Sequence, residues 1–162
     1  MWKLMTLACA ALLAVGAARA QDYSGSAFAS AATSAGMAAA ALGRMADGKS
    51  SNVKIQSLGR DIARDHEAAN EELARFADEK GFGLPDSASA SADQREDEFG
   101  SLQPEEFDRR FLEATISDHA AAIALFEREA SLGADADMRG FAQRMLPVLR
   151  GHLAAAQALQ KQ

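Results

Sequence analysis

The chain of 162 residues carries a formal charge of −6 and a single cysteine, Cys9, inside an apolar N-terminal run. This length suits one domain with one substantial core, and the lone cysteine excludes disulfides within the chain. Acidic residues outnumber basic ones by 23 to 17, which argues against a nucleic-acid partner because phosphates require a basic face.

The N-terminus has the pattern of a secretory signal peptide. Lys3 precedes an apolar run over residues 4–15, and the small-residue site Ala-Arg-Ala occupies residues 18–20. The run is shorter than the roughly 20 residues that span a bilayer, so we expect cleavage and no integral membrane span in the mature chain. The prediction is a signal peptide over residues 1–20, one domain over residues 21–162, and a periplasmic or otherwise exported location.

The mature chain is rich in helix formers, and its apolar positions recur every three or four residues, which predicts an all-α domain. The first helix is expected over residues 26–46, with small side chains that permit close helix approach. The second is expected from the cap signal Ser51-Asn52 to Gly81, a residue that favours the left-handed end of a helix. The expected inward stripes are Phe28, Ala32, Ala35, Ala39, Leu42 and Met45 in the first helix, and Ile55, Leu58, Ile62, His66, Ala69, Leu73 and Phe76 in the second.

Residues 81–103 are rich in Gly, Pro, Ser, Ala and Asp, which predicts a long connection with one short helix over residues 93–99. A third long helix is expected from Pro104 to Gly133, and a fourth after Asp135 or Asp137. The expected inward stripes are Leu112, Thr115, Ile116, His119, Ala122, Ile123, Phe126 and Ala130 in the third, and Met138, Phe141, Met145, Val148, His152, Ala156 and Leu159 in the fourth.

Four amphipathic helices with two short links and one long link predict an antiparallel four-helix bundle whose long connection joins helices two and three. The chain's three histidines, His66, His119 and His152, each fall on the apolar stripe of a different helix, near its middle. Because mid-length positions share one layer whatever the order of the helices, the three side chains are expected to form one polar cluster inside the bundle.

Several short motifs occur in a specific order over nearly the whole mature chain. They are Asp-His-Glu-Ala-Ala-Asn at residues 65–70 with Leu73, Leu-Pro at 84–85, Phe-Asp at 107–108, Asp-His at 118–119, and Leu-Pro-Val-Leu at 146–149 with His-Leu at 152–153. In these motifs the chain resembles the bacterial domain-of-unknown-function family 4142, which is described as ferritin-like and exported. The resemblance implies a ferritin-like helical bundle in the periplasm with no settled biochemical activity.

One departure from the family bears on the metal chemistry. Members of the family commonly carry Glu in the first helix, whereas residues 36–43 of this chain contain no carboxylate. A ferritin-type di-iron centre also needs Glu-x-x-His pairs. The residues three before the histidines are Ala63, Ile116 and Leu149, so a di-iron oxidase is not expected.

Two main interpretations of the histidines stay open, beside a pH switch and a small-ligand pocket. In the first, the protein is an exported binding or structural module rather than an enzyme, and the rings form a hydrogen-bonded layer with Asn70, Thr115 or water. In the second, His66, His119 and His152 hold a single divalent transition metal, as a mononuclear metal-binding protein or metalloenzyme.

Asp65, Asn70 and Asp118 are candidates for holding the metal ligands in place from behind. No catalytic residue and no organic cofactor site is indicated. Association with a protein partner or with the outer membrane is left open by the sequence.

Overall fold

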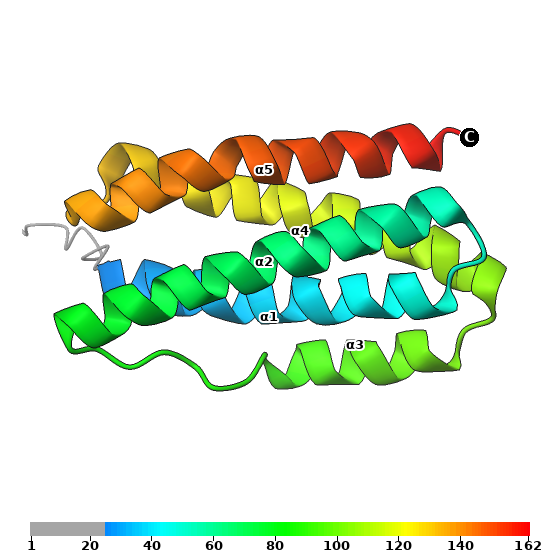
Figure 1. The fold of residues 1–162 in the computed structure, drawn as a ribbon, viewed down its shortest axis with the longest axis horizontal. Helices are drawn as coiled ribbons and strands as arrows, with labels where there is room; N and C mark the ends of the chain where they lie inside the picture. Colours follow the sequence, from blue (N-terminus) through cyan, green and yellow to red (C-terminus); the bar gives the residue numbers. More distant parts are fainter. Residues whose placement is uncertain (1–24) are drawn as a thin grey trace, which may run out of the picture.

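The structure is a computed structural model that describes residues 25–162, and the predicted signal peptide lies outside the described residues. The helices are α1 (Gly25–Lys49), α2 (Val53–Lys80), α3 (Ala90–Ser101), α4 (Pro104–Leu132) and α5 (Ala136–Gln160). The four long helices form an antiparallel bundle, and the short α3 lies along the outside of α1 (Figure 1). The predicted all-α fold, with its long connection between the second and third long helices, is confirmed.

Capping residues set the ends of two of the long helices, α2 and α5. The Asn52 side chain accepts a hydrogen bond from the Lys54 N–H at 2.9 Å and so caps α2. Gly81 ends the same helix with φ 73°, the left-handed region that glycine enters without steric cost. The Asp135 side chain caps α5 in the same way as Asn52 caps α2.

The bundle consists of two hairpins that pack against each other. One hairpin is α1 with α2 and the other is α4 with α5; they meet where α1 contacts α4 and where α2 contacts α5. Within the first hairpin, Gly43 and Gly59 bring the backbones unusually close. A Cβ atom on either glycine would lie 2.5 Å from the carbonyl oxygen of the other. Only glycine therefore permits this helix spacing.

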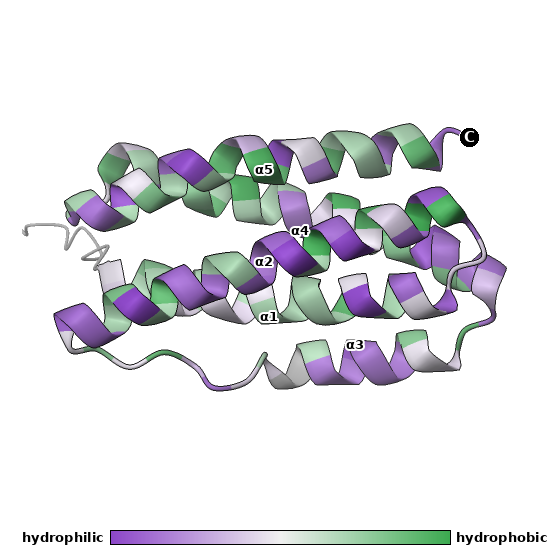
Figure 2. Ribbon diagram, in the orientation of Figure 1, coloured by the Kyte–Doolittle hydropathy of each residue, from purple (hydrophilic) through white to green (hydrophobic). Residues whose placement is uncertain are grey.

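The apolar core divides into two clusters, one at each end of the bundle. At one end Phe28 packs edge-on against Phe126, with ring centroids 5.1 Å apart. At the other end Phe107 stacks on Phe111 and also meets Phe99, which α3 contributes. Elsewhere α3 is largely hydrophilic, whereas hydrophobic and hydrophilic residues alternate along the long helices (Figure 2).

The expected stripe of α1 is wrong at one position and omits several buried residues. Ala35 is exposed, whereas Thr33, Gly36 and Ala40 are buried. The reason is physical: small side chains cover most of α1, so hydropathy does not distinguish the face that packs against α2 from the face that points outward. In α2 and α4, where charged and large apolar residues alternate, the expected stripes are buried or half-buried.

The length of α3 and the course of α5 at its proline are two further features of the fold. The short helix α3 is longer than the predicted 93–99 at both ends, since it begins at Ala90 within the Ser/Ala run and ends at Ser101. Pro147 lies within α5, which continues through it. Within residues 25–162, no helix combines the length and the hydropathy needed to cross a membrane.

A fully buried acid lies near the end of α4. Glu129 has no exposed surface, and neither of its carboxylate oxygens has a hydrogen-bond partner. Burial raises the pKa of this carboxyl, with a further contribution from Asp135. Gly133 leaves room for it, since a Cβ there would lie 2.1 Å from Glu129 Oε1.

Candidate metal centre

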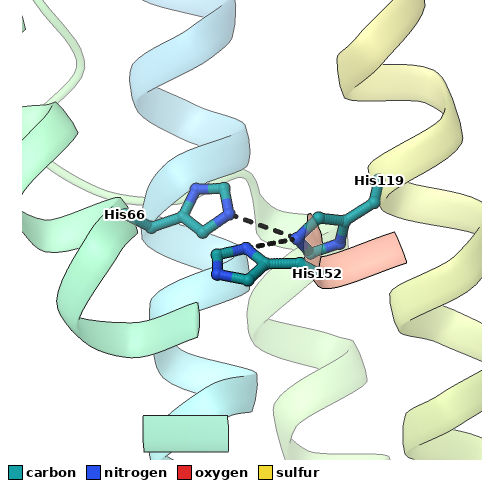
Figure 3. Close-up of side chains that lie close together, drawn as sticks. All are labelled: His66, His119 and His152. Atoms are coloured by element: carbon teal, nitrogen blue, oxygen red, sulfur yellow. Dashed lines mark hydrogen bonds between the residues drawn. The ribbon is translucent and has the colours of Figure 1, made fainter. Parts of the chain in front are cut away.

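The three histidines come together in the middle of the bundle, between the two apolar clusters. His66 comes from α2, His119 from α4 and His152 from α5, and the three rings converge (Figure 3). Their exposed fractions are 7%, 3% and 6%. His66 Nε2 lies 3.4 Å from His119 Nε2, which in turn lies 3.3 Å from His152 Nδ1. One nitrogen from each ring can be chosen so that all three lie within 4.8 Å of one another.

Two of the rings are held from behind by fixed acceptors. His119 Nδ1–H donates to the backbone carbonyl of Thr115, one helical turn earlier, at 2.9 Å. His152 Nε2–H donates to the carboxylate of Asp65 on α2 at 3.1 Å. Because a carbonyl or carboxylate oxygen can only accept, these contacts place the protons on the outer nitrogens. The inner nitrogens, Nε2 of His119 and Nδ1 of His152, therefore carry lone pairs.

The histidines are neutral at pH 7. Burial, reinforced by repulsion from His119 and His152, lowers the pKa of His66 to about 3. Burial also lowers the pKa of His119 to about 4. The pKa of His152 is lowered by burial as well, although the Asp65 carboxylate opposes the shift. Neutral imidazole is the form that binds metal ions, so no proton has to leave the site before an ion enters.

Two of the three nitrogen–nitrogen spacings match those around a metal ion, and the third pair lies within 4.8 Å. A tetrahedral ion with metal–nitrogen bonds of about 2.0–2.1 Å sets its ligands about 3.3–3.4 Å apart. The two observed contacts are 3.3 and 3.4 Å. A hydrogen-bonded layer fits less well. His66 Nε2–H can donate to the lone pair of His119, but Nδ1 of His152 still faces an acceptor at 3.3 Å with no proton between them.

A cavity of about 340 Å³ reaches the cluster from outside. It opens between α1, α3 and α4, and both His66 and His119 line it. Arg95 and Asp118, which form an ion pair, line it as well. Solvent thus has a route to two of the three rings.

The other site residues expected from sequence lie in different surroundings. Asp65 contacts His152 rather than its sequence neighbour His66. Asn70 packs against Gly36, and its Oδ1 is buried without a partner. Asp118 pairs with Arg95. Across the described helices, no hydrogen bond joins Asn70 or Asp118 to a histidine ring.

Neither Arg95 nor the cavity was predicted from the sequence. Arg95 lies in the connection, where hydropathy carries no periodic signal. The cavity results from side chains that are absent, because alanines of α1 and α4 line much of it. The contact with the Thr115 carbonyl could have been found from sequence, because residues four apart on a helix lie on the same face and Thr115 is four residues before His119.

Comparison with known proteins gives the fold and the family. Solved structures of CopM are similar to the chain: the silver-bound form obtained by soaking has a TM-score of 0.72 at 18% identity and covers 86% of this chain and 96% of that chain. The Cu(I)-bound form has a TM-score of 0.72 at 18% identity, and the Cu(II)-bound form 0.69 at 17%; both cover 85% of this chain and 96% of that chain. At these identities the likeness establishes the fold alone.

A search among curated protein sequences finds no significant match. The family model described as "Domain of unknown function (DUF4142)" matches residues 10–159. The resemblance drawn from the sequence motifs is therefore confirmed, and the chain belongs to the DUF4142 family.

Proposed function

We propose that this protein binds one copper ion through His66, His119 and His152. The observation that carries the proposal is the pair of inner lone pairs, on His119 Nε2 and His152 Nδ1, held 3.3 Å apart by acceptors behind the rings. A cation satisfies both lone pairs at once, whereas neutral hydrogen-bonded rings leave them facing each other. The geometry thus supports the metal interpretation over the hydrogen-bonded layer.

Copper is the metal that the donor set and the fold favour together. Imidazole nitrogens suit copper, zinc, iron and nickel, and divalent copper binds most tightly in this series. The CopM structures that share the fold hold Cu(I), Cu(II) or silver. Within residues 25–162, the group that could hold a metal ion consists of histidines alone, whereas ferritin-type iron sites also use carboxylates.

Each residue of the site has a distinct task. The Thr115 carbonyl and the Asp65 carboxylate orient the rings of His119 and His152, and the carboxylate offsets part of the charge of the bound ion. The cavity gives the ion a route in and out, which suits exchangeable binding. No reaction is assigned to the site. We propose that binding takes place in an exported compartment, because the sequence predicts a signal peptide over residues 1–20. Cell fractionation with and without these residues would test the location.

Two neighbouring aspartates provide a matched test of the site. Asp65 and Asp118 each precede a histidine, but Asp65 contacts a ring and Asp118 contacts Arg95. Asp65→Asn should weaken copper binding by roughly 10–100-fold. Asp118→Asn should leave copper binding unchanged, because Asp118 contacts Arg95 rather than a ring and a half-exposed ion pair contributes little to the stability of the fold.

The measurement is a competition titration against a chromophoric copper chelator, with elemental analysis of the tag-free protein. We expect one copper per wild-type chain and none in a folded His119→Gln variant. A wild-type chain that takes up no copper would refute the proposal. Equal affinities for the two aspartate variants would refute the role given to Asp65.

A further inference from the structure

The cavity beside the histidines is far larger than a metal ion requires. Its volume of about 340 Å³ compares with about 30 Å³ for one water molecule and lies at the lower end of small-molecule pockets, roughly 300–1,000 Å³. His66 and His119 form its inner wall, and each is more than nine-tenths buried. The space therefore suits a small molecule that touches the histidine cluster.

The helix facing the cluster across the cavity supplies no histidine, cysteine or carboxylate to it. The ribbon of α1 passes behind the three rings (Figure 3), and α1 lines the cavity with Ser34 and with three alanines, Ala35, Ala38 and Ala39. The methyl groups of the alanines cannot coordinate an ion. A metal held by three histidines thus keeps an open position for a ligand from outside, as exchangeable sites do.

The charges around the cavity favour an anion. Three neutral imidazoles leave the charge of a bound copper ion uncompensated on the cavity side, because Asp65 lies behind His152 and is not part of the lining. The lining carboxylate, that of Asp118, is already paired with Arg95. In this partly enclosed site, opposite charges attract more strongly than in bulk water.

From these observations we propose that the cavity binds a small anionic ligand, of the size of azide or a short carboxylate, beside the histidine-bound metal. Arg95 neutralises the lining carboxylate of Asp118, and the alanines of α1 provide the space. This inference rests on the proposed function, since the metal supplies the charge that holds the anion.

Azide added to the Cu(II)-loaded protein tests the inference. Binding should change the electron paramagnetic resonance and optical spectra of the copper saturably. Ala35→Phe places a ring in the cavity, and because Ala35 is exposed the fold should tolerate it. Ala31→Phe is the matched control: it is also exposed, lies one turn away on α1 and does not line the cavity.

We expect the wild-type and Ala31→Phe proteins to bind azide alike and Ala35→Phe to lose saturable binding while keeping one copper per chain. Arg95→Gln should weaken azide binding by about tenfold or more, because Asp118 then faces the anion unpaired. The anion proposal is overturned, and copper binding is not, if azide leaves the spectra of the copper-loaded wild type unchanged. The same holds if the Ala35→Phe variant binds azide as the wild type does. A wild type that takes up no copper overturns the proposed function as well.

Discussion

The close approach of α1 and α2 predicts opposite effects for the same substitution at different glycines. In Gly43→Ala the new Cβ would start 2.5 Å from the carbonyl oxygen of Gly59 and 3.0 Å from the backbone nitrogen of Ala63. Ordinary van der Waals contact begins at 3.4 Å, so the backbones must separate by about 0.9 Å. Backbone atoms cannot rotate away as a flexible side chain can. The whole hairpin has to adjust.

The magnitude follows from two opposing effects. Overpacking a close contact costs about 1–3 kcal/mol, and backbone against backbone belongs at the upper end. Replacing glycine by alanine inside a helix returns about 1 kcal/mol. Gly43→Ala should therefore lower the free energy of unfolding by about 2 kcal/mol and the Tm by roughly 6–8 °C.

Gly151 is the control. It lies inside α5, and a Cβ atom added there would have no neighbouring atom within 4 Å. Gly151→Ala should therefore stabilise the protein by up to about 1 kcal/mol. Urea unfolding followed by far-ultraviolet circular dichroism measures both variants. If Gly43→Ala raised stability as Gly151→Ala does, the two helices would not be as close as described.

Three other predictions follow from buried groups. Burial lowers the pKa values of His66 and His119, so below about pH 6.5 the unfolded chain binds more protons than the folded one. The free energy of unfolding should therefore fall with decreasing pH, by up to about 1.4 kcal/mol per pH unit for each histidine. A His66→Gln variant with the same pH slope as the wild type would contradict this. The raised pKa of Glu129 has the opposite sign, since the folded state retains the proton as pH rises above 4.5 and stability then declines; urea unfolding of Glu129→Gln should lack that decline. Copper at about 100 times its Kd should stabilise the wild type by about 2.7 kcal/mol in thermal unfolding, and an equal gain in His119→Gln would place the ion elsewhere.

The sequence was informative where residue types contrast. The stripe of α2 places His66 beside Ile62 and Ala69, and the structure buries all three. Mid-helix positions likewise brought the histidines into one layer. In α1, where most side chains are small, the sequence did not reveal which face is buried, and the exposure of Ala35 was missed.

Contacts between helices that are distant in the sequence could not be predicted from it. Asp65 pairs with its neighbour Arg64 and also with His152, 87 positions away. Periodicity within one helix does not specify which carboxylate meets which ring. The cavity depends on how several helices leave space together, and α3 borders it with Ala92 and Arg95. Such features depend on tertiary packing.

The histidine cluster is divided between the two hairpins. His66 and Asp65 belong to the α1–α2 hairpin, whereas His119 and His152 belong to the α4–α5 hairpin. Neither half of the chain alone contains the full donor set, so copper occupancy reports whether the halves are docked. A chain cut in the exposed connection near Ser87 should consequently behave as a metal-dependent split protein, whose two fragments reassemble more tightly when copper is present.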